Sequence, residues 1–210
     1  NKDFSWNEII SEKSSPISGA SIAGDKLIIN YLKDTLSKIE FYDLDGNYIK
    51  DLAFEGKGTL SGFSGKLGNK ISYFKFSNFT TPQRIYELDL DSLNYELYWE
   101  SNINELNADN YESELSFFAS KDGTQIPVHI SYKKELEINE TTPVLLYGYG
   151  GFNVPILPNF SKTFYMWIKS GGVLAVVNLR GGSEYGDSWH QEGMLLNKQN
   201  VFDDFAYGAK

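Results

Sequence analysis

Pro143-Val-Leu-Leu-Tyr147, followed at once by Gly148-Tyr-Gly-Gly-Phe-Asn153, decides how the second half of the chain folds. The first segment is an apolar run, as in a β-strand that is buried on both faces. Residues 160–170 carry apolar side chains at helical spacing, and Gly171-Gly172 ends that helix. Val173-Leu-Ala-Val-Val-Asn178 then predicts a second buried strand. Strands that alternate with helices in this way indicate an α/β unit built on a parallel sheet.

Further elements flank this unit on both sides. Residues 112–120 and 124–133 have the composition of strands, and Lys121-Asp122-Gly123 between them supplies a turn. Residues 200–210 predict another helix. Its first turn contains Asp203 and Asp204, where the helix dipole favours acidic groups.

The first half of the chain consists of short predicted strands separated by turns. These strands cover residues 26–32, 36–42, 47–54, 58–64, 70–76, 83–90 and 95–99. The segment that starts at Ile39 can be laid on the segment that starts at Ile85, an offset of 46 residues. A repeat of about 45 residues is typical of a β-propeller blade, with an antiparallel meander as the alternative. Closing a propeller takes roughly four to eight blades, so two blades predict a piece of a larger domain.

Composition limits the classes of function. The 210 residues include no cysteine and only two histidines, His129 and His190, which argues against disulfides, a thiolate nucleophile and a histidine-rich metal centre. The net charge of −9 argues against nucleic acid and anionic membranes as partners. The acidic excess lies in residues 1–142, and residues 84–115 hold nine acidic residues against one basic residue, Arg84. We interpret that stretch as a solvated face, with a surface for a basic partner as the alternative. No apolar run is long enough for a membrane span, and residues 1–6 do not resemble a signal peptide.

Two loops follow the predicted parallel strands, at residues 148–153 and 179–186, and parallel sheets carry their chemistry at this edge. Glycines in the first loop let the backbone approach a ligand closely. Because the third glycine of a dinucleotide fingerprint and the lysine of a Walker motif are missing, we do not expect phosphate binding. In α/β-hydrolases the loop after the third strand donates to the oxyanion hole, and the Tyr149 hydroxyl is a suitable donor.

The other polar candidates have simpler interpretations. Arg180, in the second loop, suits a structural ion pair better than an anion site. His190 is a candidate general base, although a single histidine more often only forms hydrogen bonds, and His129 lies in a predicted strand. No Gly-x-Ser-x-Gly nucleophile elbow occurs in the sequence. The chain therefore offers an oxyanion donor and no nucleophile.

Several segments together resemble the prolyl oligopeptidase family. They are residues 120–127, 146–153, 172–186, 189–190 and 197–205, while the strands before residue 110 resemble the last part of the family's propeller more weakly. The resemblance implies a mixed fold. Residues 1–110 would form about two blades of a partial β-propeller, and residues 111–210 the first part of an α/β-hydrolase domain that stops before the nucleophile elbow.

The resemblance also implies an activity for the parent protein, namely a serine peptidase that cleaves short peptides on the carboxyl side of proline. Tyr149 matches the family's oxyanion-hole tyrosine, and Phe152 matches an aromatic side chain that lines the proline pocket. The family's Ser, Asp and His triad lies downstream, so the chain alone is expected to be inactive and to need the rest of its own chain. The implied partner is a proline-containing peptide, with no cofactor and no metal. The implied location is cytoplasmic, or alternatively periplasmic.

Two other interpretations stay open on the sequence. One is a sister family, either oligopeptidase B, which prefers basic residues and needs acidic pocket residues outside this sequence, or an acylaminoacyl peptidase. The other is a propeller interaction module with a vestigial α/β extension. An intact catalytic serine downstream would exclude the interaction module.

Overall fold

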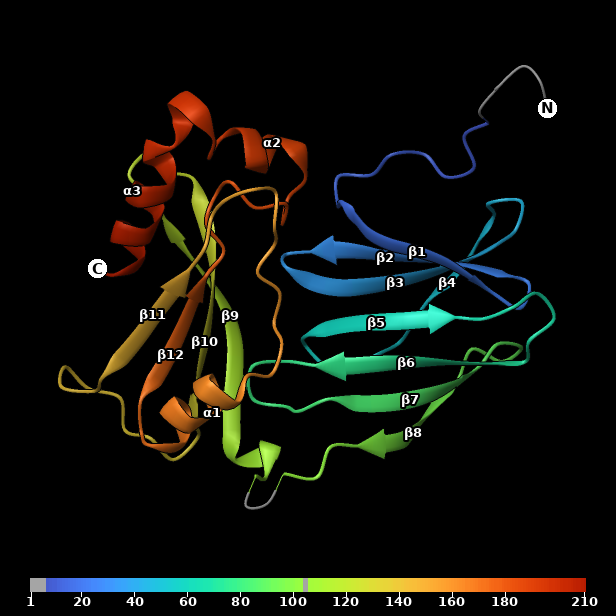
Figure 1. The fold of residues 1–210 in the computed structure, drawn as a ribbon, viewed down its shortest axis with the longest axis horizontal. Coiled ribbons are helices and arrows are strands. Elements are labelled where there is room, and N and C mark those ends of the chain that lie inside the picture. The colour runs from blue at the N-terminus through green and yellow to red at the C-terminus, as the bar shows by residue number, and fades with distance from the viewer. Residues whose placement is uncertain (1–6, 104–105) are drawn as a thin grey trace.

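The computed structural model of the chain describes residues 7–103 and 106–210, so the expectation about residues 1–6 lies outside it. This part of the chain forms three four-stranded sheets. Figure 1 shows two of the sheets side by side on the right, and the third sheet on the left with the three α-helices around it. Among the described residues, no helix combines the length and the apolar character that crossing a membrane requires.

The first two sheets are antiparallel meanders of consecutive strands. One contains β1 (Ile17–Ala23), β2 (Lys26–Lys33), β3 (Leu36–Asp43) and β4 (Tyr48–Asp51), and the other contains β5 (Thr59–Ser64), β6 (Ile71–Ser77), β7 (Arg84–Asp89) and β8 (Tyr95–Glu100). Ile39 lies in β3 and Ile85 in β7, so the sequence repeat aligns strands with equivalent places in the two sheets. Each sheet thus has the four antiparallel strands of a propeller blade, as the repeat predicts.

A shared apolar core joins these two sheets. Phe41 of β3 and Phe74 of β6 are both buried in it, together with Leu88 of β7. The Phe63 and Phe74 rings stack with their centroids 4.8 Å apart. Aromatic pairs of this kind contribute about 0.5–1.5 kcal/mol beyond their area burial. Phe63 lies on β5 and Phe74 on β6, so this pair stabilises the second blade-like sheet within the same core cluster that buries Phe41 of the first.

The third sheet is mixed. Its strands follow the order β11 (Val144–Gly148), β12 (Val173–Val177), β10 (Gln125–Lys133) and β9 (Tyr111–Ala119). β11 and β12 are parallel, as predicted, whereas β9 and β10 form an antiparallel hairpin. The hairpin joins the sheet through β10, which runs antiparallel to β12. The carboxyl ends of β11 and β12 therefore lie at one edge, and the two candidate loops leave the sheet there.

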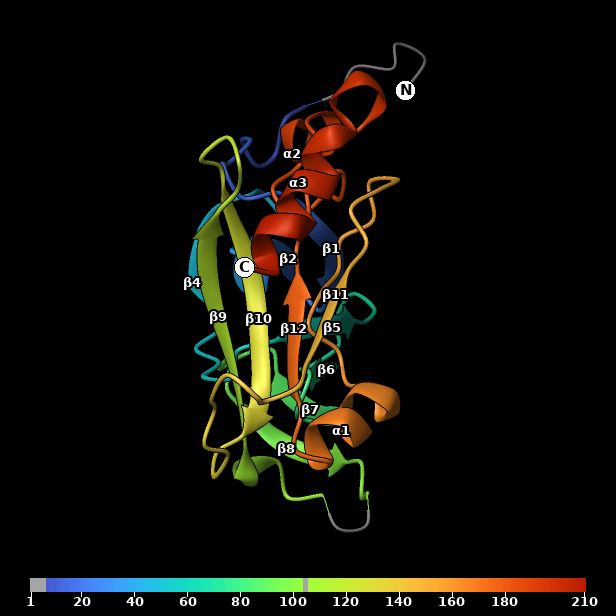
Figure 2. The same ribbon diagram turned by 90° about the vertical axis from the view of Figure 1, so that its left-hand side faces the viewer.

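Helices cover both faces of this sheet. α1 (Lys162–Lys169) joins β11 to β12 and buries Ile168 against Leu174 on one face. α3 (Gln199–Gly208) buries Val201 in the cluster on the opposite face. Figure 2 shows α3 in front of the sheet, with the blade-like sheets behind it. The short helix α2 (Asp187–Gln191) and the 3₁₀ turn η2 (Leu195–Asn197) lead from the second loop to α3.

Two local expectations are wrong. β11 is not buried on both faces, because it is the edge strand of its sheet: Val144 is 56% exposed and Tyr147 39%. α3 begins at Gln199, and its first turn contains no acidic residue. The Asp204 carboxylate lies beyond that turn and pairs instead with the buried Arg180 side chain, 2.6 Å away.

The blade-like sheets contact the third sheet through the turns at one end of their strands. Phe79, between β6 and β7, is 2% exposed and packs in the same cluster as Ile168 and Val176. The Phe160 backbone N–H donates to the Ser77 hydroxyl at 3.0 Å. The buried Phe79 ring and this hydrogen bond therefore hold the second blade-like sheet against the face of the third sheet that α1 covers.

Candidate functional site

The two loops that follow the parallel strands touch each other. The Asn153 N–H donates to the Gly181 carbonyl at 3.1 Å. A Cβ added at Gly181 would lie 2.7 Å from the Gly150 oxygen, which real Cβ contacts essentially never show. This close approach explains why glycine is needed in both loops at the point of contact.

The backbone of the first loop is left-handed at three positions. Gly150 has a φ of +59°, Phe152 of +55° and Asn153 of +57°. Gly150 also has no room for a side chain, because a Cβ there would lie 2.5 Å from Val201. Phenylalanine seldom adopts positive φ, and such conformations cost on the order of 1–3 kcal/mol. A backbone that is strained in this way persists only where the surrounding contacts hold the loop in place.

The same loop carries both side chains that the sequence singled out. Tyr149 is 46% exposed and Phe152 is 85% exposed. Their ring centroids lie 6.5 Å apart with the rings tilted by 35°. Residues 148–153 thus display two neighbouring aromatic side chains at the carboxyl edge of the sheet, where parallel sheets carry their chemistry.

Phe152 also forms part of a pocket. It has a volume of about 410 Å³, and its lining residues are Gly151, Phe152, His190, Gly193, Met194, Leu195 and Lys198. The wall combines apolar side chains with one imidazole and one ammonium group. The pocket lies between the first loop and the segment that leads into α3.

Lys198 connects these two segments directly. Its Nζ donates to the Gly150 carbonyl at 2.7 Å. Sequence reasoning found no role for Lys198, although it lies inside one of the segments that carry the family resemblance. Its only sequence signal is a lysine two residues before the predicted helix of residues 200–210, close to a helix N-terminus where a cation is unfavourable.

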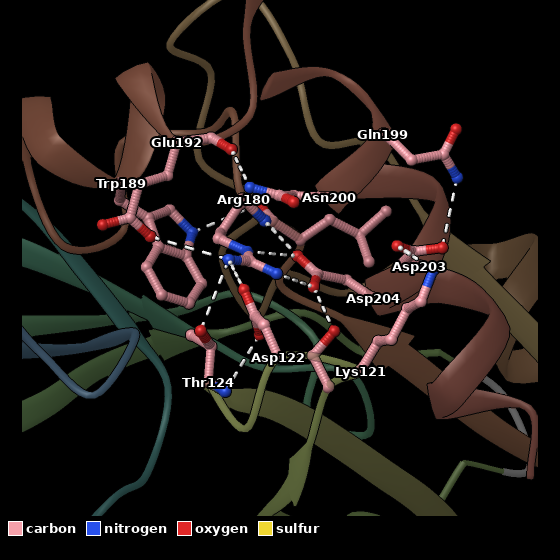
Figure 3. A network of polar contacts seen from close by, with 12 residues as sticks. Lys121, Asp122, Thr124, Arg180, Trp189, Glu192, Gln199, Asn200, Asp203 and Asp204 are labelled. Carbon is pink, nitrogen blue, oxygen red and sulfur yellow. Dashed lines mark hydrogen bonds and ion pairs between the residues drawn. The ribbon is translucent and has the colours of Figure 1, made fainter. Parts of the chain in front are cut away.

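Arg180 is held in a network of carboxylates, which Figure 3 shows. Asp204 accepts from Nε at 3.0 Å and from Nη2 at 2.6 Å, and Asp122 accepts from Nη1 at 2.6 Å. The Ser120 hydroxyl also donates to Asp204, at 2.6 Å. The network ties the β9–β10 turn, the second loop and α3 together. The expectation of a structural ion pair at Arg180 is therefore confirmed.

The charges in this network reinforce one another. Burial alone would lower the pKa of Arg180, but its hydrogen bonds to Asp204 and Asp122 outweigh that effect and raise it above its ordinary value. The hydrogen bond from Arg180 lowers the pKa of Asp122 to about 2. Arg180 and Asp122 stay charged at neutral pH, so the second loop has a fixed anchor.

The two histidines have structural partners. His190 donates from Nδ1 to the Gly181 carbonyl at 2.7 Å, which orients its ring toward the pocket. His129 is 3% exposed, and burial lowers its pKa to about 4, so it is neutral at physiological pH. Within the described part of the chain, no group of three or more His, Asp or Glu residues is placed to hold a metal ion.

Glu184 is a buried carboxyl group that the sequence did not single out. It is 1% exposed, and burial raises its pKa. Its Oε1 accepts from the Ile156 N–H at 2.9 Å, and the Asn178 amide donates to the Ile156 carbonyl at 2.6 Å. Glu184 and Asn178 therefore hold both backbone groups of Ile156 and fix the segment that follows the first loop.

Comparisons with known proteins cover both halves of the chain. The family model described as "Prolyl oligopeptidase, N-terminal beta-propeller domain" matches residues 1–101. The model described as "Prolyl oligopeptidase family" matches residues 158–210. A prolyl endopeptidase of Elizabethkingia meningoseptica is 39% identical over 204 residues, which is 97% of this chain and 29% of that protein. A prolyl endopeptidase of Dictyostelium discoideum is 36% identical over 209 residues, which is 98% of this chain and 27% of that protein.

Solved structures agree. One from a study of two prolyl endopeptidases and their inter-domain dynamics has a TM-score of 0.91 at 41% identity, covering 99% of this chain and 31% of that chain. Prolyl oligopeptidase B of Galerina marginata, bound to a 35mer hydrolysis and macrocyclization substrate, has a TM-score of 0.87 at 30% identity, covering 94% of this chain and 29% of that chain. The chain thus spans between about a quarter and a third of the length of the proteins it matches. Because one family accounts for both the blade-like sheets and the third sheet, the chain belongs to the prolyl oligopeptidase family.

Proposed function

We propose that this chain is part of a serine peptidase that cleaves short peptides on the carboxyl side of proline. Its own contribution is the oxyanion-hole tyrosine, Tyr149, and one aromatic wall of the proline pocket, Phe152. The relatives are prolyl endopeptidases, which supports the reaction. The observation that carries the assignment is that one strained, glycine-dependent loop at the carboxyl edge of the sheet displays both side chains.

Peptide hydrolysis needs a hydrogen-bond donor that acts on the carbonyl oxygen in the transition state. Attack on a peptide carbonyl places negative charge on its oxygen, and a donor aimed at that charge stabilises the transition state more than the ground state. The Tyr149 hydroxyl is such a donor, and its partial exposure leaves it accessible to a substrate. Phe152, which is more exposed, offers an apolar face for a proline ring.

The nucleophile must come from the rest of the protein, since the sequence contains no Gly-x-Ser-x-Gly elbow. We assign residues 1–110 to the partial propeller and residues 111–210 to the first part of the hydrolase domain. The proposed partner is a proline-containing peptide, and activity needs the remainder of the chain. The 210 residues alone are expected to show no turnover. A cytoplasmic location, with the periplasm as the alternative, belongs to the same proposal.

The test is Tyr149→Phe in the full-length protein, assayed by steady-state kinetics on a proline-based chromogenic peptide. Losing one oxyanion donor typically lowers kcat by about 10²–10³, and KM should change little because the hydroxyl acts in the transition state. Tyr147→Phe is the matched control, since Tyr147 lies two positions earlier and packs its ring against Phe164. A Tyr149→Phe enzyme within about twofold of wild type in kcat would remove the proposed role. Faster turnover after arginine than after proline would favour the oligopeptidase B alternative.

A further inference from the structure

Lys198 makes a long-range contact with the candidate oxyanion loop. Its ammonium group donates to the Gly150 carbonyl at 2.7 Å across 48 residues of sequence. Gly150 directly follows Tyr149, so the bonded carbonyl belongs to the Gly150–Gly151 peptide unit, one residue beyond the proposed oxyanion donor. Charge-assisted hydrogen bonds of this kind are shorter and roughly twice as strong as neutral ones.

The position of Lys198 is locally unfavourable. It occupies the N-cap of α3, where Ser, Thr, Asp and Asn are preferred, and its side chain makes no capping bond. A cation at a helix N-terminus is also repelled by the helix dipole. Residues that break such local rules are expected at sites where another requirement prevails. Here that requirement is the bond to Gly150.

The loop itself needs to be held. Gly150, Phe152 and Asn153 all have positive φ, and conformations of this kind persist only where the surroundings fix them. Two backbone bonds secure the far end of the loop: Asn153 donates to Gly181, and Val154 donates to Gly151. The Lys198 side chain secures Gly150, the residue after Tyr149. The loop is therefore held between its two exposed aromatic side chains, at Gly150, and after them, at Asn153.

We propose that Lys198 is a positioning residue, which fixes the Gly150 peptide unit and thereby aims the Tyr149 hydroxyl at the developing oxyanion. This inference rests on the proposed function of Tyr149. A transition-state donor has to be held within about 0.5 Å and 10–20° of its productive geometry. Without the ammonium group, the Gly150 carbonyl loses its charged hydrogen bond, and Tyr149 is held less precisely while the fold of the sheet remains.

The first test is Lys198→Met in the full-length protein, because methionine keeps an unbranched side chain and removes the charge. We expect kcat to fall about 10-fold to 100-fold, the range that corresponds to one charge-assisted hydrogen bond, with a smaller change in KM. The active fraction, titrated with a covalent serine-directed inhibitor, should stay at the wild-type value. Lys198→Arg should recover most of the lost kcat, because it restores a cationic donor. Lys162→Met, at the exposed first position of α1, is the matched control.

The second test is a double-mutant cycle with Tyr149→Phe. If Lys198 acts through the Tyr149 hydroxyl, Lys198→Met should lower kcat by less than about threefold once that hydroxyl is gone. Losses that multiply in the double variant would show a general structural effect and would overturn the inference. A silent Lys198→Met beside a strongly impaired Tyr149→Phe would overturn it as well, and would leave the proposed function intact. A silent Tyr149→Phe would instead remove the proposed function on which the inference rests.

Discussion

The Thr35 hydroxyl and Nε2 of His129 are hydrogen-bonded at 2.6 Å, although 94 residues separate them in the sequence. Thr35 is 1% exposed and His129 is 3% exposed. Thr35 lies in the turn between β2 and β3, and His129 lies in the middle of β10. The neighbouring turn residue, Asp34, accepts from the Tyr185 hydroxyl at 3.2 Å. The β2–β3 turn of the first blade-like sheet is therefore hydrogen-bonded both to β10 of the third sheet and to the loop of residues 179–186.

The conformation of this turn explains why it matters. Asp34 and Thr35 have φ values of +49° and +67°, as in the two-residue hairpins that usually contain Asn-Gly or Asp-Gly. A β-branched residue at positive φ is a genuine outlier, with a cost on the order of 1–3 kcal/mol. The buried bond to His129 gives a physical reason for threonine at this position in place of glycine.

Thr35→Val should lower the free energy of unfolding by about 1–3 kcal/mol, because it keeps the shape and the backbone strain but leaves the buried His129 nitrogen without a partner. Thr35→Ser keeps the hydroxyl and is the control. Urea unfolding at low protein concentration, followed by tryptophan fluorescence, measures both. If the two variants are equally stable, the hydroxyl contributes nothing and the turn is held by packing alone.

His129 should titrate far below an ordinary histidine, because burial lowers its pKa to about 4. The chain has only two histidines, so NMR titration of the imidazole C2 protons, with His129→Gln as the assignment variant, isolates it. Unfolding raises the pKa toward 6.5, so the unfolded state binds more protons between these values and stability falls as pH falls. From pH 7 to pH 5 this amounts to about 2 kcal/mol, which should be absent in His129→Gln. A His129 resonance that titrates near its ordinary value would contradict the buried bond.

Asp204→Asn should destabilise the chain by about 3–5 kcal/mol, because it removes the bidentate partner of a buried guanidinium. Arg180 and Asp204 are almost fully buried, with side-chain exposures of 3% and 0%. The neighbouring Asp203→Asn is the control: its ion pair with Lys121, at 3.3 Å, is at the surface and should be worth less than about 1 kcal/mol. Equal losses in urea unfolding would mean that the Arg180 network does not anchor α3.

The 210-residue chain should self-associate at its β11 edge. Among the described residues β11 pairs only with β12, so its other edge leaves backbone groups free beside the exposed Val144 and Tyr147 side chains. Size-exclusion chromatography should show species larger than the 23.8 kDa monomer. Val144→Lys should shift them toward the monomer, whereas Val154→Lys, outside the strand, should not. A clean monomer with cooperative unfolding would show that this edge recruits no partner.

The sequence pattern predicted the secondary-structure elements that are determined by residues close together along the chain. The Asp-Gly turns, the apolar runs of β11 and β12 and the repeat at Ile39 and Ile85 all depend on neighbours along the chain, and the structure has them. β1 was missed because its Ser-Gly-Ala-Ser stretch has weak strand propensity and is ordered by pairing with β2. The roles of Thr35, Glu184 and Lys198 depend on contacts 94, 28 and 48 residues away, which no local pattern carries.

The last prediction concerns Phe152, which should behave differently from Tyr149. The Phe152 ring is 85% exposed, so Phe152→Ala should leave thermal stability nearly unchanged. In the full-length protein it removes the proposed apolar wall of the proline pocket, which would contact the substrate in both the ground state and the transition state. Burying a phenylalanine side chain is worth about 1.5–3 kcal/mol, which corresponds to a loss of about 10-fold to 100-fold in kcat/KM. Since ground-state and transition-state binding weaken together, the loss should appear mainly in KM.

Selectivity for proline over alanine at the cleaved position should fall, and Phe152→Leu should retain more of it. Steady-state kinetics on matched proline and alanine peptides measures both quantities. A Phe152→Ala enzyme with unchanged selectivity, or one that loses kcat alone, would place the proline ring elsewhere.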